Sequence, residues 1–388
     1  MAEQSNTPQL RFQGYTDAWG QVKLGEILQE FSEKSVIENQ YPLLSSTNTG
    51  IEYRDGRVSG EHNVGYKIID QGDLVFSPQN LWLGNININH LGRGIVSPSY
   101  KTMKIVNYEA GFLEPILRSE HMLNQYKLAS IQGASVVRRN LDPALFDEIE
   151  VPYPGLEEQR KVAAIFEQME SAVALHQRKL DKLQAIKKSL LQKMFPAEGE
   201  DRPQIRFAGY TDAWGQERLG DIAQITMGQS PDGATYTDNP KDHILVQGNA
   251  DMKDHRVCPR VWTTQVTKTA EPGDIILSVR APVGEVGKTD YDVVLGRGVS
   301  GIRGNDFIYH SLIRMNEIGY WSSLSTGSTF DSINSNDISN AVIAVSSQSE
   351  QEKIGCFLTR IDDLLSLHQR KLEKLQQIKK ALLQKMFC

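Results

Sequence analysis

The chain contains the same two sequence frames twice. The segment 11–20, Arg-Phe-Gln-Gly-Tyr-Thr-Asp-Ala-Trp-Gly, recurs with one substitution at 206–215. The segment 176–195, which runs from His-Gln-Arg-Lys-Leu to Gln-Lys-Met-Phe, recurs in similar form at 368–387. The offsets are 195 and 192 residues, so the segments between the frames are almost equal in length, although they share little sequence. Two similar frames around two different inserts predict one architecture that presents two different recognition surfaces.

Length and composition agree with a duplicated globular protein. At 388 residues the chain exceeds the usual size of one domain, and two repeats of about 190 residues fit that length. The sequence lacks a secretion signal at its start and an apolar run of membrane-spanning length. Three cysteines, far apart and odd in number, favour a reducing cytoplasm. The net charge of −6 argues against a uniformly basic nucleic-acid binder but leaves room for a local basic face.

Two long helices are the clearest structural prediction. From 156 to 195 the sequence has neither Gly nor Pro, and its apolar residues step by threes and fours. The segment 348–387, which contains Gly355, repeats this apolar spacing. A helix of about 40 residues is about 60 Å long, which is too long for one globule. Each helix therefore needs a partner, and the closest candidate is its own repeat. Pairing about a pseudo-two-fold axis makes the helices antiparallel and places the two inserts at opposite ends of a rod.

The inserts read as mixed domains of short strands and turns. Examples are the apolar runs that follow Gly72-Asp73 and Gly273-Asp274. We therefore expect an α+β fold, in which two mixed α/β domains are separated by two long antiparallel helices with pseudo-two-fold symmetry. The predicted boundaries are 1–155 for the first domain, 156–197 for the central helix, 198–346 for the second domain and 347–388 for the C-terminal helix.

Motifs for catalysis are not found in the sequence. It lacks a Gly-x-x-x-x-Gly-Lys-Ser/Thr phosphate loop, an Asn/Asp-Pro-Pro-Tyr/Phe methylation motif and a Glu-x-Lys nuclease core. His and Cys do not cluster at metal-ligand spacing. His176 and His368 occupy equivalent helix positions, where a packing role is favoured over a metal site. Asp73 and Asp274 follow glycines before strands, where turn formation is commoner than metal binding. We expect no catalytic residue, no metal and no cofactor on this chain.

Several motifs together resemble one family. They are Gly14–Trp19 with Lys23–Glu26, Leu156–Val162, Gly327–Ile333 and the Leu-Leu-Gln-Lys-Met-Phe ending of both helices. The order, duplication and spacing of these motifs make the chain similar, over essentially its whole length, to the specificity subunits of type I restriction-modification systems. The first half departs from the family pattern, because Gly133–Arg139 replaces the Gly-Ser-Thr-Phe type of sequence found near 327.

The resemblance implies a DNA-recognition subunit without catalytic residues, within a multisubunit restriction endonuclease and adenine DNA methyltransferase. Each mixed domain would be a target-recognition domain that reads one half of a bipartite, asymmetric sequence in double-stranded DNA. The helices would set the spacing and dock two methyltransferase (modification) subunits, with restriction/translocase subunits as further partners. S-adenosylmethionine, ATP and Mg²⁺ would be bound by those partners, and no membrane is involved.

Candidate DNA contacts follow from residue type and loop position. Arg280 ends a strand beside a Pro/Gly loop, and Arg297 lies between two glycines that allow close approach. Gln79 and Asn80 correspond in place to Arg280, and Gly92-Arg93-Gly94 looks like the counterpart of 296–298. Because arginine suits guanine and paired amides suit adenine, the two half-sites should differ in composition. The full candidate set is Gln79, Asn80, Arg93, Arg138, Arg139, Arg280, Arg297, Ser328, Thr329 and Asn334.

Each of these residues also has a structural interpretation. In that interpretation the arginines pair with nearby carboxylates, and the Ser, Thr and Asn side chains cap turns. Trp82, beside the amide pair, is as compatible with a core position as with a wedge between bases.

The helices carry an apolar stripe that looks wider than one helix seam requires. Neighbouring leucines at 190–191 and 382–383 point in two directions, which suggests contact with both the mate helix and another subunit. The candidate interface residues are Leu180, Leu183, Leu190, Leu191, Leu372, Leu375, Leu382 and Leu383. If this is correct, Leu191→Asp with Leu383→Asp abolishes methyltransferase co-purification without harm to the fold. The lysines and arginines of the same helices form either a solvated face or a surface for phosphates and acidic partners.

Two other functions remain open from the sequence. A self-sufficient DNA enzyme with an unfamiliar site would cleave DNA alone in the presence of metal. A coiled-coil scaffold with two protein-binding heads would bind no duplex at any salt concentration, whereas phosphate binding weakens steeply with salt.

Overall fold

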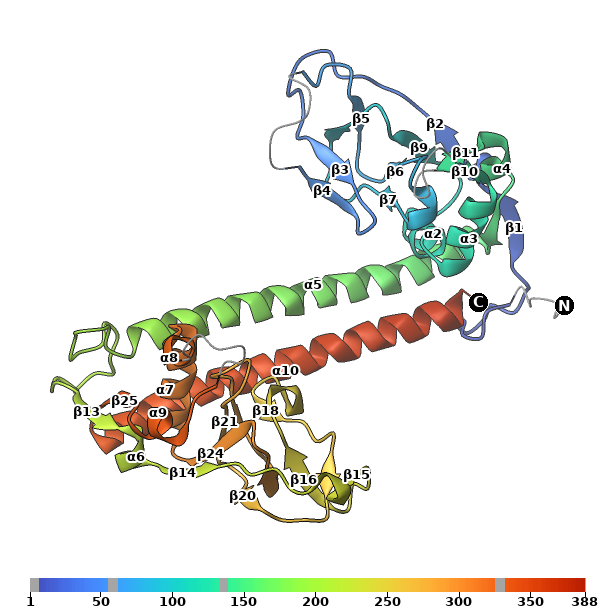
Figure 1. The fold of residues 1–388 in the computed structure, drawn as a ribbon. Helices are drawn as coiled ribbons and strands as arrows, with labels where there is room; N and C mark the ends of the chain where they lie inside the picture. The colour runs from blue at the N-terminus through green and yellow to red at the C-terminus, as the bar shows by residue number, and fades with distance from the viewer. Residues whose placement is uncertain (1–6, 55–61, 133–138, 325–331, 388) are drawn as a thin grey trace. The chain divides into compact units, whose positions relative to one another are not determined.

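The computed structural model describes residues 7–54, 62–132, 139–324 and 332–387 (Figure 1). The chain divides into two compact units: unit 1 is Met1–Leu175 with Leu372–Cys388, and unit 2 is His176–Lys371. Each unit contains one mixed α/β head and part of both long helices. In the described ranges, none of the helices is both long and apolar enough to cross a membrane.

The two long helices are confirmed as α5 (Leu156–Lys193) and α10 (Gln348–Met386). In unit 1 the Phe166 and Phe387 rings lie 5.6 Å apart, and Lys379 pairs with Glu170. Position along α10 therefore falls as position along α5 rises, so the helices are antiparallel there. Unit 2 has the same arrangement, because Lys187 Nζ lies 2.6 Å from Asp362 Oδ1 and His176 contacts His368. The two lysine–carboxylate pairs occupy equivalent positions in the repeats.

The duplicated frame makes the same contacts in both units. In unit 1, β1 (Gly20–Lys23) pairs with β12 (Glu150–Tyr153) and leads into α1 (Leu24–Ile27). In unit 2, β13 (Gly215–Arg218) pairs with β25 (Val342–Val345) and leads into α6 (Leu219–Ile222). The Leu10 amide donates to the Lys385 carbonyl at 3.0 Å, and Ile205 donates to Lys193 at 2.9 Å. The segment before each frame therefore holds the end of one long helix.

The unit 1 head is built on a four-stranded antiparallel sheet. Its order is β2 (Leu28–Glu30), β9 (Lys101–Ile105), β6 (Leu74–Phe76) and β7 (Ile86–Ile88). Three strand pairs accompany it: β5 (Lys67–Ile69) with β8 (Gly94–Val96), β3 (Leu44–Ser46) with β4 (Ile51–Tyr53), and β10 (Ser130–Gln132) with β11 (Arg139–Leu141). The head's helices are η1 (Leu81–Leu83), α2 (Ala110–Leu117), α3 (Glu120–Leu128) and α4 (Pro143–Asp147).

The unit 2 head contains two larger sheets. One has the order β14 (Gln224–Met227), β24 (Val299–Arg303), β21 (Ile275–Ser278), β22 (Val286–Lys288), β18 (Arg256–Val257), β17 (Met252–Lys253). The other has the order β15 (Tyr236–Thr237), β19 (Trp262–Thr263), β16 (His243–Val246), β23 (Val293–Leu295), β20 (Lys268–Ala270). The helices are η2 (Gly233–Thr235), η3 (Asn249–Asp251), α7 (Asp306–Glu317), α8 (Tyr320–Leu324) and α9 (Ser335–Ser339).

Strand order shows which parts of the two heads correspond. The order β2-β9-β6-β7 in unit 1 matches β14-β24-β21-β22 in unit 2, so β9 corresponds to β24. The strands that directly precede these two in the chain, β8 and β23, therefore correspond as well. Arg93 precedes β8, whereas Arg297 follows β23. The expected correspondence of these two arginines is therefore wrong: a Gly-Arg-Gly tripeptide is too short to fix a position in a sheet. The turn that corresponds to 296–298 is 97–100, between β8 and β9.

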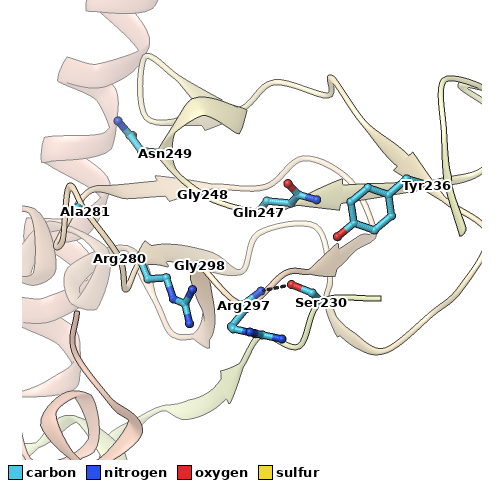
Figure 2. Close-up of a pocket in the computed structure, with 9 residues that line it drawn as sticks. All are labelled: Ser230, Tyr236, Gln247, Gly248, Asn249, Arg280, Ala281, Arg297 and Gly298. Carbon is cyan, nitrogen blue, oxygen red and sulfur yellow. Dashed lines mark hydrogen bonds between the residues drawn. The ribbon is translucent and has the colours of Figure 1, made fainter. Parts of the chain in front are cut away.

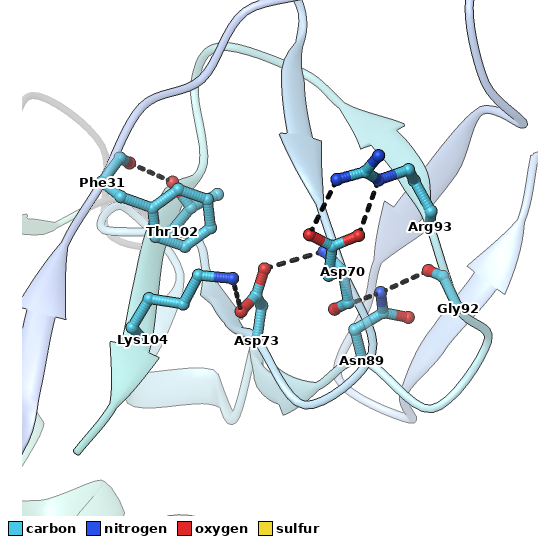
Figure 3. A network of polar contacts seen from close by, with 8 residues as sticks. All are labelled: Phe31, Asp70, Asp73, Asn89, Gly92, Arg93, Thr102 and Lys104. Atoms are coloured by element: carbon cyan, nitrogen blue, oxygen red, sulfur yellow. Dashed lines mark hydrogen bonds and ion pairs between the residues drawn. The ribbon is translucent and has the colours of Figure 1, made fainter.

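The aspartates before the central strands form turns, as the commoner interpretation predicts. Asp73 Oδ2 accepts a hydrogen bond from the Asp70 amide at 2.7 Å, and its Oδ1 lies 2.6 Å from Lys104 Nζ (Figure 3). In the same way, Asp274 Oδ2 accepts from the Glu271 amide at 2.9 Å, and its Oδ1 accepts from Arg303 at 3.2 Å. Both carboxylates close the turn before the strand and pair with a basic side chain, Lys104 or Arg303, on the neighbouring strand.

The end of each long helix completes the core of a head. In unit 2, Leu191, Met194 and Phe195 are buried in one cluster with Trp214 and Phe307. In unit 1, Met386 is buried, and Leu382, Leu383 and Phe387 pack on the head's core, with the Phe387 ring 5.0 Å from Phe112.

This packing corrects one expectation about the leucines. Leu191 is fully buried in the core of unit 2, and Leu190, Leu382 and Leu383 are half-buried against the cores of their own units, so packing within the chain already accounts for much of this stripe. Leu191→Asp would place a carboxylate in a core, so loss of a partner in that variant would show only misfolding. Leu180 and Leu372 are also buried, and Leu183 and Leu375 are half-buried, at helical spacing along the same stripe.

Phe195→Ala tests the role of the helix end. The side chain is 3% exposed and its ring lies 5.3 Å from that of Phe307, so its removal leaves a cavity. We expect a loss of about 3 to 5 kcal/mol of unfolding free energy in unit 2, measured by urea unfolding with tryptophan fluorescence. The exposed neighbour provides the control: Gln192→Ala should stay within about 0.5 kcal/mol of the parent. Equal stability of the two variants would contradict this account of the core.

The pair formed by His176 and His368 predicts that the free energy of unfolding depends on pH. The two Nδ1 atoms lie 2.9 Å apart, and one ring must be neutral to accept the hydrogen bond. Burial, together with the nearby His176, Lys179 and Lys371, lowers the pKa of His368 below its ordinary value of 6.5. Since the unfolded chain then binds protons more readily, stability is complete above pH 6.5 and falls as the pH drops below it.

We therefore expect His368→Gln to lose less unfolding free energy than the parent between pH 6.5 and about pH 5. Unfolding in urea at a series of pH values measures this. The exposed His243→Gln serves as the control, and buried His310, whose pKa is also lowered, contributes equally in all variants. A His368→Gln profile parallel to that of the parent would overturn the prediction.

Candidate nucleic-acid interface

An open concavity of about 430 Å³ lies at the tips of several strands in unit 2 (Figure 2). It brings together the turn after β23, the loop after β21, the loop after β16 and the segment that leads to β15. The residues that line it are Ser230, Tyr236, Gln247, Gly248, Asn249, Arg280, Ala281, Arg297 and Gly298. Two of the arginines predicted from the sequence therefore lie in one site.

Backbone contacts hold the two arginine-bearing loops together. The Val279 amide donates to the Gly298 carbonyl at 2.9 Å, and Ser278 Oγ donates to the Arg280 carbonyl at 2.9 Å. A Cβ at position 298 would lie 2.0 Å from the Gln247 carbonyl oxygen, so only glycine allows this approach. The Arg297 loop is thus packed directly on the strand end that carries Gln247.

Arg280 and Arg297 differ in their partners from three other arginines of the unit 2 head. The side chains of Arg280 and Arg297 are exposed, and among the described residues neither has a hydrogen bond or ion pair to a carboxylate. Three other arginines of the unit are held by carboxylates: Arg256 by Asp290 at 2.8 Å, Arg260 by Asp251 at 2.8 Å and Arg303 by Asp274 at 3.2 Å. Arg280 and Arg297 therefore keep their donors available for a phosphate or a base edge.

Sequence reasoning missed several residues of the concavity. Gln247 and Asn249 meet the arginines because β16 pairs in parallel with β23. Ser230 is brought there by the hydrogen bond that its Oγ accepts from the Arg297 amide, and Tyr236 by the pairing of β15 with β19, which in turn pairs with β16. The available signal was local: two amides flank Gly248 directly after the apolar run of β16.

In unit 1 the predicted arginines have partners. Arg93 donates to both oxygens of Asp70, at 2.7 and 3.2 Å (Figure 3). Its guanidinium also lies 5.4 Å from the centre of the Tyr41 ring. The hydrogen bonds between the two side chains lower the pKa of Asp70 and raise the pKa of Arg93. Arg139 donates to Ser130 Oγ and to the Ser130 carbonyl, which ties β11 to β10. These interactions favour the structural interpretation for both arginines.

The remaining candidates have mixed environments. Gln79 is exposed and Asn80 half-buried after β6, the place that corresponds to Arg280 after β21. Asn334 caps α9 by accepting from the amides of Asn336 and Asp337. Arg138, Ser328 and Thr329 lie outside the described residues. Trp82 is half-buried and packs against the unit 1 core. Within the described ranges, no three His, Cys, Asp or Glu side chains come together as a metal site would require.

The duplicated frame and the arginine-lined concavity define a two-headed recognition protein. The sequence matches the family described as "Type I restriction modification DNA specificity domain" over residues 17–185 and again over 211–377. The chain therefore belongs to this family and carries its domain twice.

Individual relatives agree with this assignment. The chain is 27% identical over 288 residues to a Methanocaldococcus jannaschii protein provisionally named type I restriction enzyme MjaX specificity subunit; the match covers 71% of this chain and 66% of the relative. A solved structure concerned with complex assembly and conformational transition of the type I R-M system is 25% identical, with a TM-score of 0.51 over 95% of this chain and 97% of the other. The type I S subunit from M. genitalium, 12% identical, shares the fold with a TM-score of 0.70 over 98% and 99%.

Proposed function

We propose that each head of this specificity subunit reads one half of a bipartite, asymmetric sequence in double-stranded DNA. The observation that carries the proposal is the concavity of unit 2, where two exposed arginines lack carboxylate partners in the described residues. Arginine and lysine bind phosphates for affinity, and arginine, asparagine and glutamine read base edges for sequence. The heads differ at their strand tips, so the two half-sites differ.

The long helices would fix the spacing between the half-sites. Each helix is continuous over 38 or 39 residues and contributes residues to both units. A helix of this length with a packed mate is stiff, so the number of helical residues would set the gap in the DNA target.

Two methyltransferase subunits would dock on the helices. Unit 1 exposes Leu175 and Ile378, and unit 2 exposes Leu367 and Ile186. These residues are equivalent in the repeat, so each unit offers the same apolar side chains to solvent. Equal surfaces suit two copies of one partner, whereas the unequal heads suit two DNA half-sites.

The chemistry would belong to the partners. S-adenosylmethionine would be bound by the methyltransferase subunits, and ATP and Mg²⁺ by restriction/translocase subunits. This chain would supply recognition and geometry. We place the complex in the cytoplasm, because Cys258 and Cys356 are exposed and unpaired, as in a reducing compartment.

Mapping of methylated adenines tests the recognition role. Genomic DNA from cells with the chain should carry methylation at a bipartite motif with a fixed gap, and cells without the chain should lose that motif. Sequencing that detects N6-methyladenine provides the measurement. Retention of the motif without this chain, or metal-dependent cleavage of DNA by the purified chain alone, would refute the proposal.

Charged substitutions on the exposed helix residues test the docking role. Ile186→Asp with Ile378→Asp places a charge on the same apolar position in both units, and we expect at least about tenfold weaker methyltransferase binding, measured by co-purification and by titration. Gln184→Asp with Gln376→Asp is the matched control, because it adds the same charge about 200° around each helix. Equal binding by both double variants would rule out this surface.

A further inference from the structure

Arg280 and Arg297, which have no carboxylate partner among the described residues, project from fixed backbone supports. Arg280 follows buried Val279, whose amide is bonded to Gly298, and residue 280 forms a bridge with Ser332. Both guanidinium groups belong to the same concavity (Figure 2). Fixed supports of this kind suit recognition that depends on direction as well as charge.

The Arg297 turn is poorly arranged for a phosphate. A phosphate-binding turn presents several free backbone N–H groups. Here the amide of Gly296 donates to Val246 at 2.7 Å, that of Arg297 to Ser230 Oγ at 3.2 Å, and that of Val299 to Gly296 at 3.2 Å. The turn therefore offers a ligand the side-chain fork of Arg297. Such a fork matches the O6 and N7 acceptors of guanine in the major groove.

We propose that Arg280 and Arg297 each read one guanine, so that the half-site recognised by unit 2 contains two G·C pairs. This assignment rests on the proposed function and adds the base that each side chain reads.

In the part of unit 1 that the structure describes, this arrangement does not recur at the corresponding places. The loop after β6 carries Gln79 and Asn80, and the turn after β8 is Ser97-Pro98-Ser99-Tyr100. Neither segment has an arginine, and the nearest one in sequence, Arg93, is bound to Asp70. Loss of the unit 2 arginines should therefore alter one half-site and leave the other unchanged.

The experiment selects DNA from a duplex library with the complete complex of this chain and its methyltransferase. The chains compared are the parent, Arg280→Ala, Arg297→Ala and Arg280→Lys. In each alanine variant we expect the preference for guanine at one position to fall about 5- to 150-fold, at two different positions of the same half-site. Arg280→Lys should keep more of the guanine preference than Arg280→Ala, because lysine also donates to the O6 and N7 acceptors of guanine although it lacks the planar fork. Arg256→Ala, at an exposed arginine already paired with Asp290, is the control and should select the parental sequence.

Two results would overturn the assignment while leaving the proposed function intact. One is that the half-site altered by these variants contains no G·C pair. The other is that the alanine variants weaken binding to all sequences equally and reduce its salt dependence, as loss of a phosphate contact does. Failure of the parental complex to select any bipartite sequence would instead refute the proposed function.

Discussion

A buried arginine–glutamate pair fixes each head to the start of a long helix. Arg11 donates to both carboxylate oxygens of Glu158 at 2.9 and 2.8 Å, and Arg206 donates to those of Glu350 at 2.7 and 2.9 Å. Glu158 is 2% exposed and Glu350 is fully buried, so each carboxylate depends on its arginine. Both glutamates lie in the first turn of their helix, where the helix dipole favours a negative charge. The first residue of each repeated Arg-Phe-x-Gly-Tyr-Thr-Asp-Ala-Trp-Gly frame, Arg11 or Arg206, makes this contact with the long helix.

The two compact units do not follow the two sequence repeats, because the end of each long helix packs into a head from the other repeat. Unit 1 needs Met386 from the last turn of α10 for its core, and unit 2 needs Phe195 beyond the end of α5. Each core thus contains residues from both repeats. The division at 155, 197 and 346 expected from the sequence separates heads from helices, whereas the compact units include parts of both helices. A head joined to one helix start and one helix end has its orientation on both helices determined by packing.

The sequence predicted the parts that depend on repetition and periodicity. Both long helices follow from apolar spacing, and the turn role of Asp73 and Asp274 follows from local chemistry. Strands of three or four residues carry too little pattern to order a sheet, so Arg93 was matched to the wrong turn. The apolar stripe led to the expectation that Leu191 contacts the mate helix or another subunit, whereas it is buried in the unit 2 core, because helical spacing does not distinguish these partners from a head. Gln247 and Asn249 were missed because only the parallel pairing of β16 with β23 brings them to the arginines.

In each head, the charged turn pair and the proposed recognition residues lie at opposite ends of the central strand. The strand β21 begins after the turn closed by Asp274 and Arg303 and ends at Ser278, two residues before Arg280. The strand β6 begins after the turn closed by Asp73 and Lys104 and ends before Gln79. The charged pairs that hold the sheet therefore lie at one end of the strand, and the side chains that differ between the heads lie at the other. Substitutions at the tips leave the turn pair, the joint to the helix and the core unchanged. Because of this separation, two heads with the same supporting contacts can carry different proposed recognition residues. The same separation accounts for inserts that differ in sequence between nearly identical flanking segments.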